Sequence, residues 1–304
     1  MLSIVIVNYN ASPYLENCLR SIYSDSSVKT TTFEVIAVDN NSKDESVKMV
    51  REKFPDVRLI ENERNEGFIR ANNKGIMASK GTYILSLNND TFVLPGALEN
   101  LVNFMDCHPE AGACGAKVLN GDGSIQHQCK RGFPTLSSAF FYFLHLHQLF
   151  PKSKLFGRYL MTYLDPEKIS EVDSVSGSCL MVKRAVIKDV GIMDEDYTMY
   201  GDDLDWCYRI KKAGWKVYYV PDAEIIHYGG RGGSRVRPYR NIWEFHRSMI
   251  IFYKKHYARN HMALLSWCVY GGILIKGVID LAANFLRKEK VVGSKKPAGF
   301  SSNH

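Results

Sequence analysis

Short apolar runs alternate with stretches of helical periodicity along residues 1–105. The runs cover residues 2–7, 33–38, 57–61 and 83–87, and each has the length of a buried strand. Between them, apolar positions recur every three or four residues, which is typical of a helix with one buried face. The pattern therefore predicts an α/β fold in which helices flank a mostly parallel, Rossmann-like sheet.

Capping residues predict where three of the helices begin. Ser12 is expected to cap the first helix, with Pro13 in its first turn. Ser42 and Glu45 have the spacing of a capping box ahead of the second helix. Pro95 is expected to open the third.

The second half of the chain repeats this pattern less regularly. We expect strands at 179–183, 216–220 and 224–227, and a helix that begins near Asp202. Residues 130–170 are rich in aromatic side chains and are interpreted as a mobile or acceptor-facing insertion.

Polar side chains follow three of the predicted strands. They are Asn8-Tyr9-Asn10, Asp39-Asn40-Asn41-Ser42 and Asn88-Asn89-Asp90. In open α/β sheets ligands bind outside the carboxyl ends of the strands, so we expect these groups to share one crevice. Neither a G-x-G-x-x-G nor a P-loop pattern follows the first strand, which argues against a dinucleotide dehydrogenase and a P-loop NTPase.

The acidic residues at these strand ends have two interpretations each. Asp90 is suited to bind a divalent ion that bridges phosphate oxygens, and Asn-Asn-Asp is equally good turn material. Asp39 is placed to hydrogen-bond a nucleobase or ribose, or to favour the dipole of the following helix.

Two later clusters also carry candidate chemistry. Asp202, Asp203 and Asp205 lie at a predicted helix start, where they either cap the helix or supply the base that sugar transfer requires. His227 ends an apolar run just before the glycine-rich basic segment that contains Arg231 and Arg235. It is either an ordinary histidine or a metal ligand beside arginines that bind a diphosphate.

The formal net charge of +7 arises largely from the C-terminal third of the chain. A nucleoside diphosphate, an anionic membrane surface and nucleic acid are the candidate partners. We expect no nucleic acid, because the sequence has no recognised motif for binding it.

The compartment is expected to be the cytoplasm. No basic leader or cleavage site accompanies the apolar run 2–7, so a secretory signal is not expected. The seven cysteines are scattered and form no C-x-x-C pair, which favours reduced thiols over disulfides or a zinc ribbon.

The C-terminal segment is apolar. Residues 263–275 carry no charge, and the run extends to Leu286 if Lys276 and Asp280 are tolerated. An interfacial helix, a spanning helix and a helix packed on its own domain are all compatible with this length, and we expect the interfacial helix. The chain is therefore expected to end in a membrane-associating helical segment over 261–304.

An ordered series of motifs extends over residues 1–260. It comprises Ile6 to Asn10, Val38 to Ser42, Asn65-Glu66-Gly67 with Asn73, Leu87 to Asp90, Gly177 to Arg184, Gly191 to Glu195, Gly201 to Asp205, and His227. This series resembles the inverting family-two glycosyltransferases of GT-A fold, and particularly their rhamnosyltransferase-like branch.

The resemblance implies a role for each candidate residue. The roles are nucleoside binding by Val7, Tyr9, Asp39 and Asn89; binding of a divalent metal, Mg or Mn, by Asp90 and His227; diphosphate binding by Arg231 and Arg235; and general base catalysis by Asp203. Two positions depart from the family pattern. Asn88 replaces an acidic residue, which leaves Asp90 as the single carboxylate of that element, and Asp202 stands where glutamate is usual.

The resemblance also implies the reaction. Sugar transfer from a nucleoside diphosphate donor to a hydroxyl would invert the anomeric carbon in one displacement. Residues 1–105 would bind the nucleotide and residues 106–260 the acceptor. Deoxythymidine-linked rhamnose is the expected donor and a uridine-linked hexose the second choice. The acceptor would be a glycan or polyprenyl-linked glycan, with the protein peripheral on the inner face of the cell membrane. A nucleotidyltransferase and an inactive sugar-binding protein are the alternatives.

Overall fold

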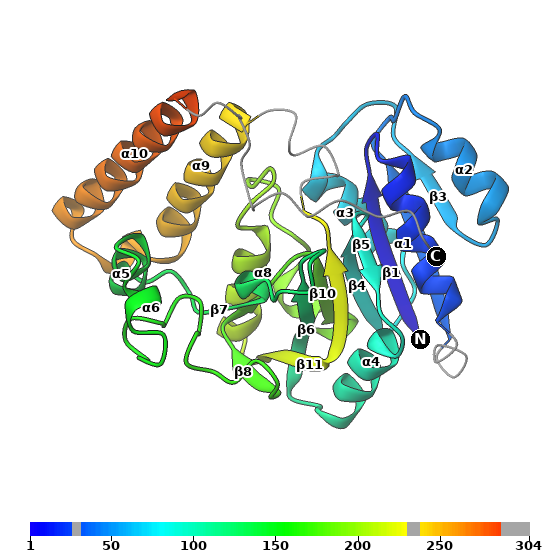
Figure 1. Ribbon diagram of the computed structural model, residues 1–304, viewed down its shortest axis with the longest axis horizontal. Helices are drawn as coiled ribbons and strands as arrows, with labels where there is room; N and C mark the ends of the chain where they lie inside the picture. The colour runs from blue at the N-terminus through cyan, green and yellow to red at the C-terminus, as the bar shows by residue number, and fades with distance from the viewer. Residues whose placement is uncertain (26–31, 230–237, 287–304) are drawn as a thin grey trace.

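The computed structural model describes residues 1–25, 32–229 and 238–286, and its centre is one mixed sheet (Figure 1). Its order is β3-β2-β1-β4-β10-β6-β11-β5, with β8 paired to β11. The strands are β1 Leu2–Asn8, β2 Phe33–Asp39, β3 Arg58–Glu61, β4 Tyr83–Asn88, β5 Thr91–Val93, β6 Ala111–Leu119, β8 Ser170–Val172, β10 Cys179–Lys183 and β11 Lys216–His227. A separate two-stranded sheet pairs β7, Lys130–Arg131, with β9, Ser174–Val175.

Helices flank this sheet, which confirms the predicted fold class (Figure 1). They are α1 Ser12–Ser24, α2 Ser46–Lys53, α3 Phe68–Ala78, α4 Ala97–Cys107, α5 Leu136–Phe143, α6 Leu146–Leu149, α7 Arg184–Val190, α8 Asp202–Lys212, α9 Pro238–His256 and α10 Ala263–Leu286. Single 3₁₀ turns, η2 at His127–Cys129 and η4 at Ala258–Asn260, complete the described elements.

The register of the parallel strands brings their polar ends together. Asn8 pairs with Asp39, and Val7 pairs with both Val38 and Asn88. The carboxyl ends of β1, β2 and β4 therefore lie at one edge of the sheet, as the sequence predicted.

The predicted strands are confirmed to within a residue or two, although two of them form one strand and β5 to β9 were not predicted. Strands 216–220 and 224–227 are one strand, β11, with an irregular register between Val220 and Glu224. Pro221 lies in that interval, and proline has no N–H to donate to a strand ladder. The sequence pattern did not predict β6, because its alanine, glycine and cysteine residues give a weak strand signal.

Pro13 lies in the first turn of α1 as predicted, but the two predicted serine caps were wrong. Ser12 lies inside α1, whose N-cap is Ala11 and makes no side-chain bond. Ser42 Oγ donates to Asp39 Oδ1 at 2.6 Å instead of capping α2, which begins at Ser46. The helix after Pro95 begins at Ala97. Ser12 is thus one residue too late to be the N-cap of α1, and Ser42 lies four residues before α2 begins.

The C-terminal helix α10 packs against α9 (Figure 1). At 1.5 Å per residue its 24 residues span about 36 Å, and by length and composition the helix could cross a membrane. Its buried positions are Ser266, Ile273, Gly277 and Asn284. Its exposed face is apolar and includes Leu264, Trp267, Leu274, Ile275, Val278, Ile279, Phe285 and Leu286.

Candidate active site

A hydrogen-bonded chain of side chains connects the ends of β1, β2 and β4. Asn8 Nδ2 donates to Asp39 Oδ1 at 3.0 Å, and Asn89 Nδ2 donates to Asn8 Oδ1 at 2.9 Å. Ser42 completes the shell of Asp39, since its backbone N–H donates to Asp39 Oδ2 at 2.8 Å. Asp39 thus accepts hydrogen bonds from β1 and from the turn after its own strand, and the three strand ends form one connected polar surface.

Val7 and Tyr9 flank this surface in different ways. Val7 is buried against Ile36, Val38 and Ala71, so it shapes the floor below Asn8. Tyr9 is 37% exposed and directly follows the strand, where its ring is available for stacking. The structure therefore brings together the four residues that the sequence suggested for nucleoside binding: Val7, Tyr9, Asp39 and Asn89.

Asp90 and His227 meet because β11 pairs with β5 in antiparallel register, with His227 opposite Thr91. His227 Nε2 lies 3.1 Å from Asp90 Oδ1 and 3.1 Å from Asn88 Nδ2. The Oδ1 atom of Asn88 is buried and has no hydrogen-bond partner among the described residues. The Asp90 carboxylate, the His227 imidazole and the Asn88 side-chain amide thus lie together, with the amide nitrogen of Asn88 facing His227 and its oxygen unpartnered among the described residues.

Gln126 holds the His227 ring, and sequence reasoning missed it. Its Nε2 donates to the His227 carbonyl at 2.7 Å, and its Oε1 lies 3.2 Å from His227 Nδ1. A proton on Nδ1 would satisfy that oxygen and leave Nε2 with its lone pair. Gln126 lies in a loop with no recognisable motif, so the sequence gave no signal for this role.

These donors fit a divalent ion that takes its other ligands from phosphates and water. Within the described ranges, His, Cys, Asp and Glu side chains form no group of three or more that could hold a metal. This absence is consistent with the sequence, because the amide of Asn88 stands where the family pattern has a second carboxylate. Arg231 and Arg235, the suggested diphosphate ligands, lie outside the described residues.

Asp203 is held at the start of α8 by an unexpected partner. Its Oδ2 accepts from Arg131 Nη2 at 2.5 Å and from the Gly177 N–H at 2.9 Å. Burial opposes the charge of Arg131, but the neighbouring Asp203 carboxylate raises the pKa of that guanidinium overall. Arg131 is on β7, 72 positions away in sequence, which is why no local pattern identified it.

The three carboxylates of α8 have different surroundings. Asp205 is fully buried, and it binds His256 Nε2 at 2.7 Å and Arg209 Nε at 2.7 Å. Burial opposes its charge, but these two partners lower its pKa overall. Burial, followed by the negative charge of Asp203, raises the pKa of Asp202. Neither residue caps α8 through its side chain, because Gly201 is the N-cap.

The turn at residues 176–178 connects the Asp203 region to the Asp90 region. The Ser178 carbonyl accepts from the Asn88 N–H at 3.1 Å, and the adjacent Gly177 N–H binds Asp203. Asp203 and the Asn88–Asp90 segment therefore contact the two sides of one short turn. This arrangement can hold a donor diphosphate at the strand ends and a proton acceptor beside it.

Comparisons with known proteins agree with this architecture. Over 95% of its length the chain is 29% identical to an N-acetylglucosaminyl-diphospho-decaprenol L-rhamnosyltransferase of Mycobacterium tuberculosis, covering 96% of that protein. It is 24% identical to the low-salt glycan biosynthesis hexosyltransferase Agl10 of Haloferax volcanii, over 74% of this chain and 66% of the relative.

Solved structures share the fold. A mannosyltransferase from Pyrobaculum calidifontis in complex with GDP-Man and Mn²⁺ superposes with a TM-score of 0.59 at 18% identity, covering 93% of this chain and 74% of that one. TarS of S. aureus in complex with UDP-GlcNAc gives 0.54 at 17% identity, over 83% and 66%. At these identities the likeness shows the GT-A fold alone.

The family model described as glycosyl transferase family 2 matches residues 3–191. That span contains β1, β2, β4 and the Asn88–Asp90 segment, which form the polar edge of the sheet. Because the match covers more than half of the 304 residues, the chain belongs to glycosyl transferase family 2.

Proposed function

We propose that this protein transfers rhamnose from a deoxythymidine diphosphate donor to a hydroxyl of a polyprenyl-linked glycan, with inversion. The observation that carries the proposal is the match to the mycobacterial rhamnosyltransferase along nearly the whole of both chains. The polar edge formed by Asn8, Asp39 and Asn89 supports it, because an intact nucleotide surface is what a donor of this class requires.

Asp203 is the proposed general base. It takes the proton of the acceptor hydroxyl as that oxygen bonds to the anomeric carbon and the carbon–diphosphate bond breaks. Arg131 and the Gly177 N–H orient its carboxylate, and 15% of its side chain is exposed to solvent. The leaving group departs as the nucleoside diphosphate.

Single displacement is supported by the state of the other two α8 carboxylates. A double displacement needs a second carboxylate as nucleophile. Asp205 is fully buried in ion pairs with Arg209 and His256, and Asp202 is 5% exposed. Neither is placed to attack a sugar, which leaves Asp203 to act as a base.

Asp90, His227 and the Asn88 amide oxygen are the proposed ligands of Mg²⁺ or Mn²⁺. A bound divalent ion would neutralise negative charge that develops on the leaving diphosphate. Gln126 contributes by fixing the ring of His227. The tyrosine and amide groups at the end of β1 hold the nucleoside, so that its diphosphate extends toward Asp90.

The proposed location is the cytoplasmic face of the membrane. The face of α10 that turns away from α9 is apolar, with Trp267 73% exposed and Leu286 81% exposed. On the other face, Asp280 binds His246 of α9 at 3.0 Å and also Lys276 of α10 itself at 2.5 Å. A helix held to its own domain by charged groups is better suited to lie on a bilayer than to cross it.

The full chain should be incubated with a panel of nucleotide sugars, Mg²⁺ or Mn²⁺, and polyprenyl-diphosphate-linked N-acetylglucosamine. We expect release of deoxythymidine diphosphate and rhamnose incorporation into the lipid, and no pyrophosphate. Turnover of a uridine-linked hexose instead would show that the donor is that sugar nucleotide and not the rhamnose donor. Pyrophosphate release would indicate a nucleotidyltransferase, and the absence of both products would favour a sugar-binding protein.

A further inference from the structure

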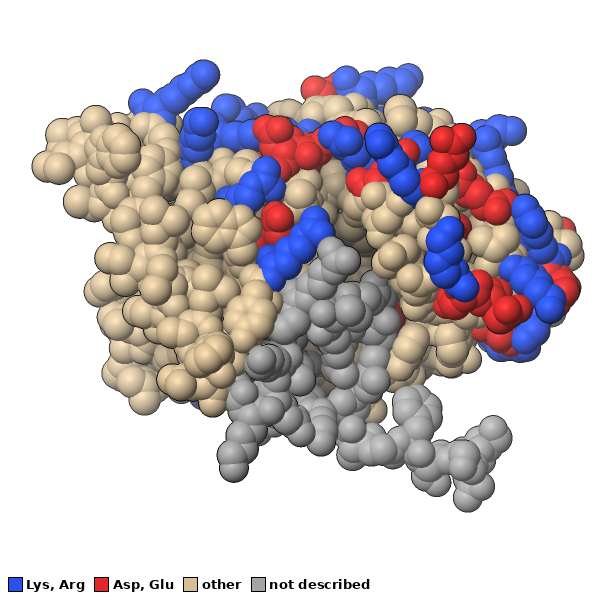
Figure 2. Space-filling view, turned by 90° about the horizontal axis from the view of Figure 1, so that it is seen from above, with Lys and Arg blue, Asp and Glu red and all other residues tan. Residues whose placement is uncertain are grey.

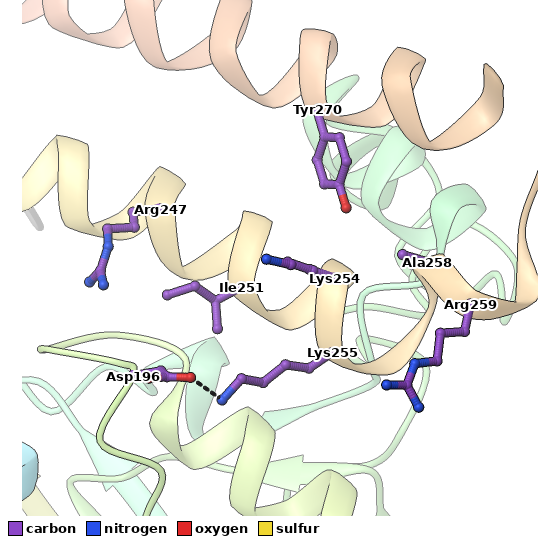
Figure 3. Close-up of a pocket in the computed structure, with 8 residues that line it drawn as sticks. All are labelled: Asp196, Arg247, Ile251, Lys254, Lys255, Ala258, Arg259 and Tyr270. Carbon is purple, nitrogen blue, oxygen red and sulfur yellow. Dashed lines mark ion pairs between the residues drawn. The ribbon is translucent and has the colours of Figure 1, made fainter. Parts of the chain in front are cut away.

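A hollow of about 810 Å³ lies between α9, α10 and the loop before α8 (Figure 3). The hollow is open to solvent rather than enclosed. Its lining includes four basic residues and one carboxylate: Arg247, Lys254, Lys255, Arg259 and Asp196. Tyr270 projects into it from α10, as Figure 3 shows.

Not all of these cations are neutralised within the described residues. Lys255 binds Asp196 at 2.6 Å and also contacts Asp194, and Arg247 binds Glu244 at 3.2 Å. Lys254 and Arg259 are exposed, and neither has an ion-pair partner in the part of the chain that the structure describes. The hollow therefore carries excess positive charge and is suited to an anion.

The start of α8 lies against α9 beside the hollow, since a Cβ added at Gly201 would lie 3.3 Å from Ser248, the neighbour of Arg247. His256, adjacent to Lys255 in sequence, binds Asp205, which lies two positions after Asp203 on α8. The donor surface is joined to Asp203 through the 176–178 turn, which contributes no residue to the lining of the hollow.

The surface next to the hollow is apolar. α10 exposes Leu274, Ile275 and Val278, and α5 exposes Phe140 and Leu144. These helices are in contact, since Lys276 Nζ lies 5.7 Å from the ring centre of Phe143. Figure 2 shows that this end of the molecule, on the left, is tan over most of its surface, whereas charged residues gather to the right.

We infer that the hollow between α9 and α10 binds the diphosphate of a polyprenyl-linked acceptor. This inference rests on the proposed function, because only such an acceptor carries an apolar chain, a diphosphate and a sugar hydroxyl in sequence. The apolar face of α10 receives the lipid side, Lys254 and Arg259 bind the phosphates, and the sugar extends toward Asp203. Charge complementarity thus selects this acceptor over a neutral glycolipid.

The test compares wild type with a Lys254→Gln/Arg259→Gln variant in neutral detergent micelles. We expect the KM for farnesyl-diphosphate-linked N-acetylglucosamine to rise about tenfold or more, because charge-assisted hydrogen bonds are lost. The KM for the donor, and for the same sugar on farnesol without phosphate, should not change. A Lys80→Gln/Lys188→Gln variant, which alters two exposed lysines elsewhere, is the matched control.

A binding measurement separates this site from the reaction itself. Titration with farnesyl diphosphate in the same micelles should show at least tenfold weaker binding to the double variant. Equal affinities or equal KM values would overturn the inference, as would a defect seen only with phosphatidylglycerol vesicles. If wild type binds farnesyl diphosphate through these residues but transfers no sugar, the proposed function fails and the anion site stands.

Discussion

At the scale of single residues, the carboxylates at the start of α8 differ in what surrounds them. Asp203 keeps an exposed edge while Arg131 and Gly177 orient it, whereas Asp205 serves two ion pairs. Adjacent residues on one helix therefore have separate chemical tasks, and substitutions can tell them apart.

Replacing Asp203 with asparagine should abolish proton transfer while preserving side-chain size. Base catalysis typically contributes about 100-fold to 10,000-fold, so Asp203→Asn should lower kcat by a factor in that range with donor affinity nearly unchanged. Steady-state kinetics together with donor titration measure both. Asp202→Asn is the matched control and should retain most of the turnover. If Asp202→Asn is inactive and Asp203→Asn is not, the base is the neighbouring residue.

The buried Asp202 makes stability depend on pH. Because its folded pKa is raised, the native chain keeps this proton after the unfolded chain has lost it. Its contribution is therefore favourable only at low pH, and stability is lost as pH rises above about 4, the usual carboxyl pKa, toward the folded value. Asn mimics the protonated acid, so Asp202→Asn should raise Tm more at pH 7 than at pH 4. An equal change in Tm at both pH values would show that Asp202 is ionised in the native protein.

Asp90 should be required for any donor binding that depends on a divalent metal. Asp90→Asn preserves shape beside His227 but removes the single carboxylate of the proposed metal site. Calorimetric titration of the donor should then give the same affinity with and without Mn²⁺, whereas wild type should bind more tightly with it. Circular dichroism should show an intact fold. Undiminished Mn²⁺-dependent binding by this variant would remove Asp90 from the site.

At the scale of elements, α3 lies exceptionally close to the sheet. A Cβ added at Gly75 would lie 2.3 Å from Val5 Cγ1 and 3.3 Å from Val38 Cγ2. Val5 is fully buried, so the strand has little room to move away. The glycine is therefore needed for packing, despite its cost to a helix.

Gly75→Ala should destabilise the fold by about 1–3 kcal/mol, because overpacking outweighs the better helix propensity of alanine. Urea denaturation measures the change in free energy of unfolding. Met77→Ala, at a position of α3 that is 66% exposed, should be nearly neutral. Adding Val5→Ala should recover part of the loss in the Gly75→Ala background. A neutral Gly75→Ala would show that α3 can shift without cost.

At the scale of the whole molecule, apolar and charged surfaces are separated. On the face shown in Figure 2 the left end of the molecule is mostly tan, and the charged residues gather over the middle and the right. The described helix α10 packs on α9 through the pair of His246 and Asp280, so its outward face is what a bilayer would meet. Membrane binding can therefore be tested by substitutions on the outward face of α10, without deleting the helix.

Ile275→Glu combined with Ile279→Glu places two charges on the exposed face of α10, at positions that are 64% and 55% exposed. Sedimentation with phosphatidylglycerol vesicles should show at least tenfold weaker binding, because buried charges are costly in a bilayer interface. Donor hydrolysis in solution should be unchanged. Met77→Glu is the control on another exposed face. Unaltered sedimentation would assign the anchor to another segment, such as residues 139–150.

The sequence by itself determined the alternation of strands and helices and the polar ends of β1, β2 and β4. These features are local, because side-chain periodicity records which face of an element is buried, and strand ends of a parallel sheet meet at one edge. Asp203 was a candidate base through the series of motifs rather than through its surroundings, and that role stays a prediction. Arg231 and Arg235 stay predictions.

Only the tertiary structure decided what surrounds those residues. Arg131 reaches Asp203 across 72 positions, and Gln126 reaches His227 across 101. No periodicity records such pairs, since they depend on how β7 and the loop before η2 are placed against the sheet. The hollow between α9 and α10 has the same origin. Its cations come from α9 and the turn after it. Its walls form only when α10 packs back against α9. A periodic sequence pattern does not record such contacts between segments that are distant in the chain.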